Sequence, residues 1–337
     1  MKTRIPKHLL SLLGLLIIVS LACNGTSTTA VESTPTTEIQ STSGGQPANP
    51  SVAGIAPISL PDKRENQAGD VNSSNNANRK MVSGGEQFIK GLYERPFNAE
   101  TMDTYFPYLD IVDTQGFKDA TWGYATITMA GADKNGHLPG KYAVELDLNK
   151  DGRGEWLILV SNPSSTDWSK QGVQVWKDAN GDVGGSLPTV SEKNISGDGY
   201  ETLVFDEGKG DRIDDAWARV SAENSMTVTI AFKLSLIGNP QSYALGAWAG
   251  SAESLNPALF DFNDHMTHDE AGSPIPDFYV YPLKKLAEID NTCRIAIGFV
   301  PTGKEPGLCQ TLIHEDPGAV PAPVCKPPVA GIMNPCP

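Results

Sequence analysis

Residues Tyr142–Val160, YAVELDLNKDGRGEWLILV, place an acidic, glycine-containing loop between two apolar runs. Tyr142–Leu148 alternates apolar with polar or small side chains, and Trp156–Val160 is short and apolar, as is typical of strands. Gly152 lies where the chain must turn between the two runs. The stretch therefore predicts two strands joined by a loop, within a β-sheet protein.

The loop carries oxygen-bearing side chains at positions 1, 3, 5 and 9 of a D-x-N-x-D-G pattern: Asp147, Asn149, Asp151 and Glu155. This alternation directs their oxygens toward one centre, and Ca²⁺ requires six to eight oxygen ligands. An EF-hand would have Glu at position 12, where this chain has Ile158, so the loop is instead similar to the calcium hairpins of β-proteins. We expect a structural calcium ion here; the alternative is a turn with solvated carboxylates.

A second loop repeats the alternation with Asp178, Asn180 and Asp182 in KDANGDVGG. It is a second candidate calcium site. The dipeptide Asn180-Gly181 is by itself typical of a tight hairpin turn, which is the alternative.

Trp168 lies in the polar segment PSSTDWSK. An exposed indole can stack on the face of a sugar ring, so Trp168 is the candidate ligand-binding residue. Packing into the core is the alternative, because it is the commoner fate of tryptophan.

Short apolar runs with a period near two continue along the chain, separated by Gly, Asp, Asn and Pro; examples are Tyr108–Val112, Gly123–Met129 and Ala244–Ala249. Helical patterns are scarce, and 33 Gly and 25 Pro in 337 residues also disfavour a helical protein. We expect an all-β domain over residues 84–312, folded as an antiparallel sandwich of the jelly-roll type.

Residues 1–23, MKTRIPKHLLSLLGLLIIVSLAC, place basic residues before an apolar run, as an export signal does. The ending Leu21-Ala22-Cys23 resembles the lipobox of bacterial lipoproteins, in which the cysteine is lipidated and becomes the first residue. We therefore expect a lipid anchor on Cys23 and an extracytoplasmic location at the cell surface. Secretion after ordinary cleavage near Ala22, or a retained anchor, are the alternatives.

Residues 24–83 are rich in Ser, Thr, Asn and Pro and contain too few apolar side chains to offset the entropy of folding, which predicts a disordered tether. Residues 313–337 form a tail rich in Pro and Cys. Besides Cys23, the cysteines are Cys293, Cys309, Cys325 and Cys336. An even number in an exported chain predicts disulfides, and pairing neighbours, Cys293 with Cys309 and Cys325 with Cys336, closes the shortest loops. A four-thiolate metal site is the alternative.

The net charge of −14 argues against nucleic acid or an anionic lipid surface as partner, because both attract clustered Lys and Arg. The chain has no G-x-S-x-G, no H-E-x-x-H and no Gly-rich phosphate loop. We therefore expect no catalytic activity.

The run YFPYLDIVDTQGFKDATWGYATITMAGADKNGHLPGKYAVELDL, Tyr105–Leu148, resembles the opening of the DOMON-like and family 9 carbohydrate-binding sandwiches. The chain from there through DLNKDGRGEWLILVS, VWKDANGDVGG, YETLVFDEGKGDRIDDAWARVS and DNTCRIAIGF is also similar to surface lipoproteins of environmental bacteria, particularly Chloroflexota. The first resemblance implies a β-sandwich that binds sugar or haem.

These observations predict a cell-surface, calcium-stabilised and non-catalytic binding module, with glycan as the favoured ligand. One alternative is a structural or adhesive envelope protein that binds other proteins. The third hypothesis is a carboxylate-dependent glycan hydrolase.

Overall fold

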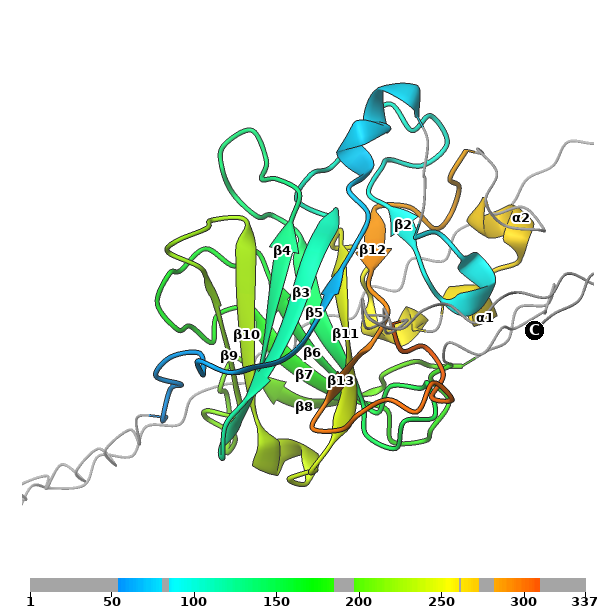
Figure 1. Ribbon diagram of the computed structural model, residues 1–337. Coiled ribbons are helices and arrows are strands. Elements are labelled where there is room, and N and C mark those ends of the chain that lie inside the picture. The colour runs from blue at the N-terminus through cyan, green and yellow to red at the C-terminus, as the bar shows by residue number, and fades with distance from the viewer. Residues whose placement is uncertain (1–53, 81–84, 185–196, 261, 273–281, 310–337) are drawn as a thin grey trace, which may run out of the picture. The chain divides into compact units, whose positions relative to one another are not determined.

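The apolar runs form two facing antiparallel sheets in the computed structural model, which describes residues 54–80, 85–184, 197–260, 262–272 and 282–309 (Figure 1). The smaller sheet has the order β1 (Arg64–Gly69), β3 (Ile111–Lys118), β4 (Trp122–Met129), β10 (Thr227–Lys233) and β9 (Ala216–Val220). The larger has the order β2 (Glu94–Arg95), β12 (Ile289–Asn291), β11 (Tyr243–Gly250), β5 (Lys141–Asp147), β6 (Trp156–Ser161), β7 (Val173–Lys177) and β8 (Thr202–Asp206). The predicted all-β sandwich is confirmed.

Helical segments are short. They are α1 (Phe262–His265), α2 (His268–Ala271) and the 3₁₀ turns η1 (Ser73–Asn75), η2 (Ala77–Arg79), η3 (Phe88–Lys90), η4 (Leu234–Ile237) and η5 (Pro257–Leu259). Within the described ranges, no helix has the length and apolar character needed to span a membrane.

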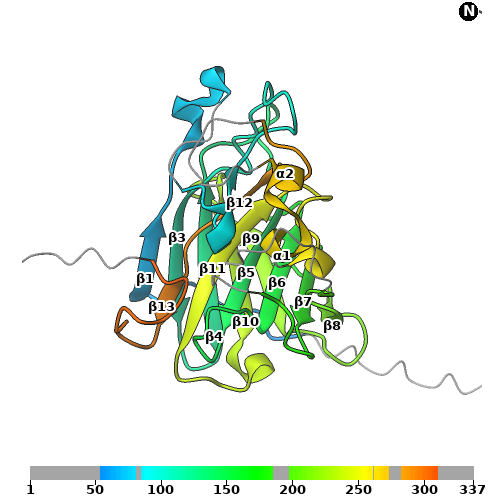
Figure 2. The ribbon, with the colours of Figure 1, turned by 90° about the vertical axis from the view of Figure 1, so that its right-hand side faces the viewer.

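The central strands of the larger sheet are buried on both faces. Along β5, Tyr142, Val144 and Leu146 point into the core between the two sheets, whereas Ala143 and Glu145 point to the opposite, outer face. Ala143 and Glu145 are also buried, because an outer layer of loops and short helices, rich in aromatic residues, covers this face. Figure 2 looks toward the larger sheet, with α1 and α2 lying over part of it.

The last two strands lie one after the other along the same edge of β11. β12 pairs with Trp248–Gly250, and β13 (Ile295–Ile297) pairs with Tyr243–Leu245. Between them Thr292 exchanges hydrogen bonds with Ala247: its N–H donates to the carbonyl at 3.0 Å, and its hydroxyl accepts the Ala247 N–H at 3.1 Å. Strand pairing with β11 is interrupted between β12 and β13, and the chain from Thr292 to Arg294 departs from the sheet there.

A disulfide joins Cys293 to Cys309, as predicted. It holds the segment that ends at Cys309 against the chain between β12 and β13, where Arg294 exchanges backbone hydrogen bonds with Gly307 and Cys309 at 2.8 Å. Cys23, Cys325 and Cys336 lie outside the described residues, as does the tail 313–337.

The sandwich begins earlier in the chain than the sequence predicts. β1 lies inside the range 24–83 that we expected to be a disordered tether, yet it pairs with β3 and buries Ala68 in the core. The tether prediction is therefore wrong for Arg64–Gly69. Its sequence, RENQAG, offers almost no apolar signal because this edge strand is held mainly by backbone hydrogen bonds.

The strand predicted at Tyr108–Val112 instead runs from Ile111 to Lys118. Its apolar pattern is broken at Gly116, where an added Cβ would overlap the side chain of Ile297. Because β13 packs so close, only glycine fits at position 116, and glycine does not contribute to the apolar pattern that predicts a strand.

Candidate functional site

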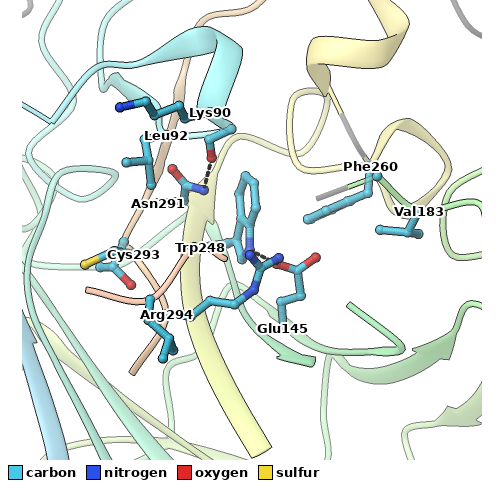
Figure 3. A pocket seen from close by; sticks show the side chains of 14 residues that line it. Lys90, Leu92, Glu145, Val183, Trp248, Phe260, Asn291, Cys293 and Arg294 are labelled. Carbon is cyan, nitrogen blue, oxygen red and sulfur yellow. Dashed lines mark hydrogen bonds and ion pairs between the residues drawn. The ribbon is translucent and has the colours of Figure 1, made fainter. Parts of the chain in front are cut away.

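A cavity of about 100 Å³ opens on the outer face of the larger sheet (Figure 3). This is several times the space that one water molecule needs. Its described lining residues are Lys90, Gly91, Leu92, Glu145, Val183, Gly184, Trp248, Phe260, Asn291, Thr292, Cys293, Arg294, Gly307 and Leu308. We call this cavity the outer pocket.

The floor of the outer pocket is a buried ion pair. Arg294 donates from Nη2 to Glu145 Oε2 at 2.7 Å. The indole N–H of Trp248 lies 3.3 Å from the same oxygen, and the hydroxyl of Tyr200 donates to Glu145 Oε1 at 2.7 Å. Figure 3 shows Arg294 and Glu145 meeting beside the indole of Trp248. One carboxylate therefore receives three side-chain donors from different segments.

The electrostatics of the floor keep these donors protonated. Burial disfavours the charged guanidinium, but the carboxylates of Glu145 and Asp147 outweigh it and raise the pKa of Arg294. Burial, together with the charge of Glu145, raises the pKa of Tyr200 well above its usual value. Arg294 is thus a cation at neutral pH, and Tyr200 is a neutral donor.

Glycine makes room for this arrangement. An added Cβ at Gly154 would overlap both the Tyr200 hydroxyl and the Glu145 carboxylate. At Gly246, which lies opposite Glu145 on β11, an added Cβ would lie 3.2 Å from Arg294 Cγ. Both glycines therefore permit polar side chains to cross the outer face of the sheet.

The walls of the outer pocket are aromatic on one side and polar on the other (Figure 3). The rings of Trp248 and Phe260 pack edge to face with centroids 4.7 Å apart. Across the pocket, the Asn291 amide donates to the carbonyl of Gly91 at 2.8 Å, beside the exposed Lys90. Because Cys293 also lines the pocket, the disulfide holds one of its walls in place.

The structure brings three of the predicted calcium ligands together. Asp147, Asp151 and Glu155 each place a carboxylate oxygen within 4.8 Å of the others. The Asn149 oxygen accepts the N–H of Asp151 at 2.8 Å, and its amide donates to Glu155 Oε1 at 2.7 Å. Asn149 thus bridges the two acidic residues.

Backbone N–H groups also reach this cluster. The two oxygens of Asp147 accept from Lys150 at 2.6 Å and from Gly152 at 2.8 Å, and Glu155 Oε2 accepts from Leu148 at 2.6 Å. Burial raises the pKa of Glu155 to about 7, and the charges of Asp147 and Asp151 add to this. These bonds form a turn in which Asp147 is buried, unlike the turn with solvated carboxylates that was the alternative, and calcium binding stays a prediction.

In the second loop, an aspartate likewise accepts hydrogen bonds from backbone N–H groups. Asp178 accepts from Gly181 at 2.6 Å and from Val183 at 3.0 Å, while the Asn180 amide donates to Asp182 at 3.2 Å. The two loops therefore share a turn geometry. An ion in the second loop likewise stays a prediction.

Trp168 is half-buried against the outer side of the smaller sheet. The guanidinium carbon of Arg219 lies 4.4 Å from its ring centroid, and the ring of Tyr124 packs at 6.3 Å. This position corresponds to the packing alternative. A ligand role for Trp168 remains a prediction.

The sequence analysis did not identify Glu145 or Arg294. Glu145 occupies a polar position in an alternating strand, a pattern that usually indicates a solvated face. Arg294 follows a cysteine in an unremarkable apolar run, DNTCRIAIGF. Only the aromatic layer over the sheet turns these two residues into a buried pair.

No family model, curated protein or solved structure matches this chain. The predicted resemblance to DOMON-like and family 9 carbohydrate-binding sandwiches therefore rests on the sequence stretches quoted above.

Proposed function

We propose that the protein is a non-catalytic binding module that receives one sugar unit of a glycan in the outer pocket. The observation that carries this proposal is the convergence of a buried carboxylate and guanidinium, an amide and two aromatic rings on one small cavity. Pockets for small ligands typically combine apolar walls with a few fixed polar groups.

The chemistry of the lining suits a sugar. Hydroxyl groups both donate and accept, so they match a lining with carboxylate, amide and guanidinium groups. Arg294 Nε is buried without a partner and is an available donor. The C–H faces of a sugar ring are apolar and fit the rings of Trp248 and Phe260, while Lys90 at the rim would meet an outer hydroxyl or an acidic substituent.

The same lining favours binding over hydrolysis. A glycosidase uses two carboxyl groups about 5 Å apart when it retains configuration, or about 6.5–9.5 Å apart when it inverts it. Among the described lining residues Glu145 is the single carboxylate, and Arg294, Trp248 and Tyr200 already occupy it. A glycan hydrolase is therefore the weaker proposal.

The cellular location that we propose rests on the sequence at the N-terminus. The signal-like run that ends at Cys23 supports attachment of the module to the outside of a membrane through a lipid. The predicted calcium loop at Asp147 would stiffen the connection between β5 and β6, next to Glu145 in the outer pocket.

A glycan array probed with the full chain tests the proposal. We expect retention on a restricted set of glycans. Trp248→Phe, which loses the indole donor but keeps an aromatic ring, should weaken binding about tenfold or more, equivalent to about 1.4 kcal/mol. Lys90→Ala, at an exposed position, should weaken it less.

Trp168→Ala separates the outer pocket from the ligand role predicted for Trp168, because it removes an aromatic residue that packs against the other sheet. Its binding should equal that of the wild type. Absence of binding to every glycan, or loss of binding in Trp168→Ala with Trp248→Phe unaffected, would contradict the assignment to the outer pocket.

A further inference from the structure

Four carboxylates from distant parts of the chain gather where the two sheets meet. Asp70 follows the end of β1, Glu94 lies on β2, Asp110 precedes β3 and Asp290 lies on β12. Glu94, Asp110 and Asp290 are fully buried, and Asp70 is half-buried. We refer to these four residues as the junction cluster.

One oxygen of each carboxylate is held by the protein. Asp70 Oδ1 accepts the N–H of Val71 at 2.8 Å, and Asp290 Oδ2 accepts the N–H of Ile111 at 2.6 Å. The other two carboxylates share Ser73, whose N–H donates to Asp110 Oδ2 at 2.9 Å and whose hydroxyl donates to Glu94 Oε1 at 2.5 Å.

The other oxygen of each carboxylate has no partner. Asp70 Oδ2, Glu94 Oε2, Asp110 Oδ1 and Asp290 Oδ1 are all buried without a hydrogen bond. A buried carboxylate oxygen left unpaired is costly, and four at one place point to a missing positive charge.

The nearest basic residue along the chain does not supply that charge. Arg95 follows Glu94 but pairs with Glu86 at 2.6 Å and donates to the carbonyls of Ala271 and Leu286. Burial raises the pKa of Asp290 well above its usual value, and the charges of Glu94, Asp70 and Asp110 raise it further. The junction cluster thus brings four acidic side chains close together in a buried environment.

We propose that the junction cluster is a binding site for a hard divalent cation, best matched by Ca²⁺. Oxygens that share one calcium ion at 2.3–2.6 Å lie at most about 5 Å apart. Carboxylate oxygens of Asp70, Glu94 and Asp290 lie within 4.8 Å of one another, and the charge of Asp110 acts on all three.

Ligand type and surroundings favour calcium over other metals. The ligands are carboxylates, without a thiol or imidazole, which excludes a preference for zinc or copper. Mg²⁺ usually retains several waters, whereas this site is buried and offers many oxygens. Gly85 closes one side, where an added Cβ would lie 3.1 Å from Glu94 Oε2.

The bound ion would fasten β1 to the rest of the sandwich. Asp70 is at the end of β1, and its three partners belong to segments of both sheets. Calcium would therefore secure the strand that leads from the predicted membrane tether into the folded domain.

Calcium titration of the full chain, stripped of metal at pH 8, tests the site. At a hundredfold excess over its Kd, Ca²⁺ should raise the melting temperature by about 5–10 °C. It should also slow hydrogen exchange at the amides of Arg64–Gly69. Equal concentrations of Mg²⁺ should have a smaller effect.

Asp290→Asn should abolish the calcium-dependent protection of Arg64–Gly69 and reduce the calcium-induced rise in melting temperature. In chelator the same variant should melt at or above the wild-type temperature, because it removes one of the repelling charges. Asp151→Asn, in the separate acidic loop after β5, is the matched control and should keep the calcium-dependent protection of β1. If Asp290→Asn does not fold, Asp70→Asn, at the half-buried position, replaces it.

Two results would overturn the proposal. One is protection of β1 that does not change with calcium in the wild type. The other is an equal calcium response in the wild type and in the Asp290→Asn or Asp70→Asn variant.

Discussion

Removing one charge from the floor of the outer pocket should destabilise the protein strongly. Glu145 is 2% exposed and Arg294 is 8% exposed, so water solvates either charge poorly when its partner is lost. Glu145→Gln keeps a side chain that can bond to Tyr200 and Trp248 but leaves Arg294 without a counter-charge. Arg294→Met fills a similar volume and leaves Glu145 unpaired.

The magnitude follows from the 2.7 Å separation of the two charged groups. At an effective dielectric constant of about 20, their attraction is about 6 kcal/mol before the cost of desolvation. Breaking one side of a buried pair typically costs about 3–5 kcal/mol. Replacing both partners costs less than the sum of the two changes, and we expect a coupling of about 2–3 kcal/mol.

Urea unfolding of the wild type, both single variants and the double variant measures this coupling. With a slope of about 3 kcal/mol per molar urea, each single change should lower the midpoint by about 1–1.7 M, and the double variant should recover part of the loss. Single-variant losses below about 1 kcal/mol, the size typical of exposed ion pairs, would refute the reasoning that this floor is dry.

Mass spectrometry of the mature N-terminus should find a diacylated or triacylated Cys23; an unmodified chain that begins beyond it would exclude the lipid anchor. In the predicted calcium loop, Asp151→Ala should remove the part of the calcium-induced melting shift that persists in Asp290→Asn, whereas no such residual shift would indicate that the loop is only a turn. The hydrogen bond from Lys285 lowers the pKa of Glu270 to about 2. The ionised Glu270 side chain therefore stabilises the folded protein fully above its ordinary pKa near 4.5, and this contribution is lost as the pH falls toward 2. The difference in melting temperature between the wild type and Glu270→Gln should therefore shrink over that interval, and a constant difference would contradict it.

Local sequence determined the β5–β6 hairpin and the pairing of Cys293 with Cys309. In both, the interacting residues are close along the chain, so apolar periodicity and loop closure are sufficient to predict the contact. The acidic alternation in the loop after β5 likewise predicted that Asp147, Asp151 and Glu155 would converge.

Tertiary structure alone decided what covers each face and which distant segments meet. Alternation along β5 shows that Glu145 is on the face opposite Val144, but the aromatic layer that buries it comes from other parts of the chain. The junction cluster joins Asp70 to Asp290 across most of the domain, and each acidic residue by itself resembles an ordinary surface residue. The apolar period and the composition of a segment predict which side chains share one face of a strand. The burial and the electrostatic environment of those side chains depend on contacts with distant segments, which no local pattern specifies.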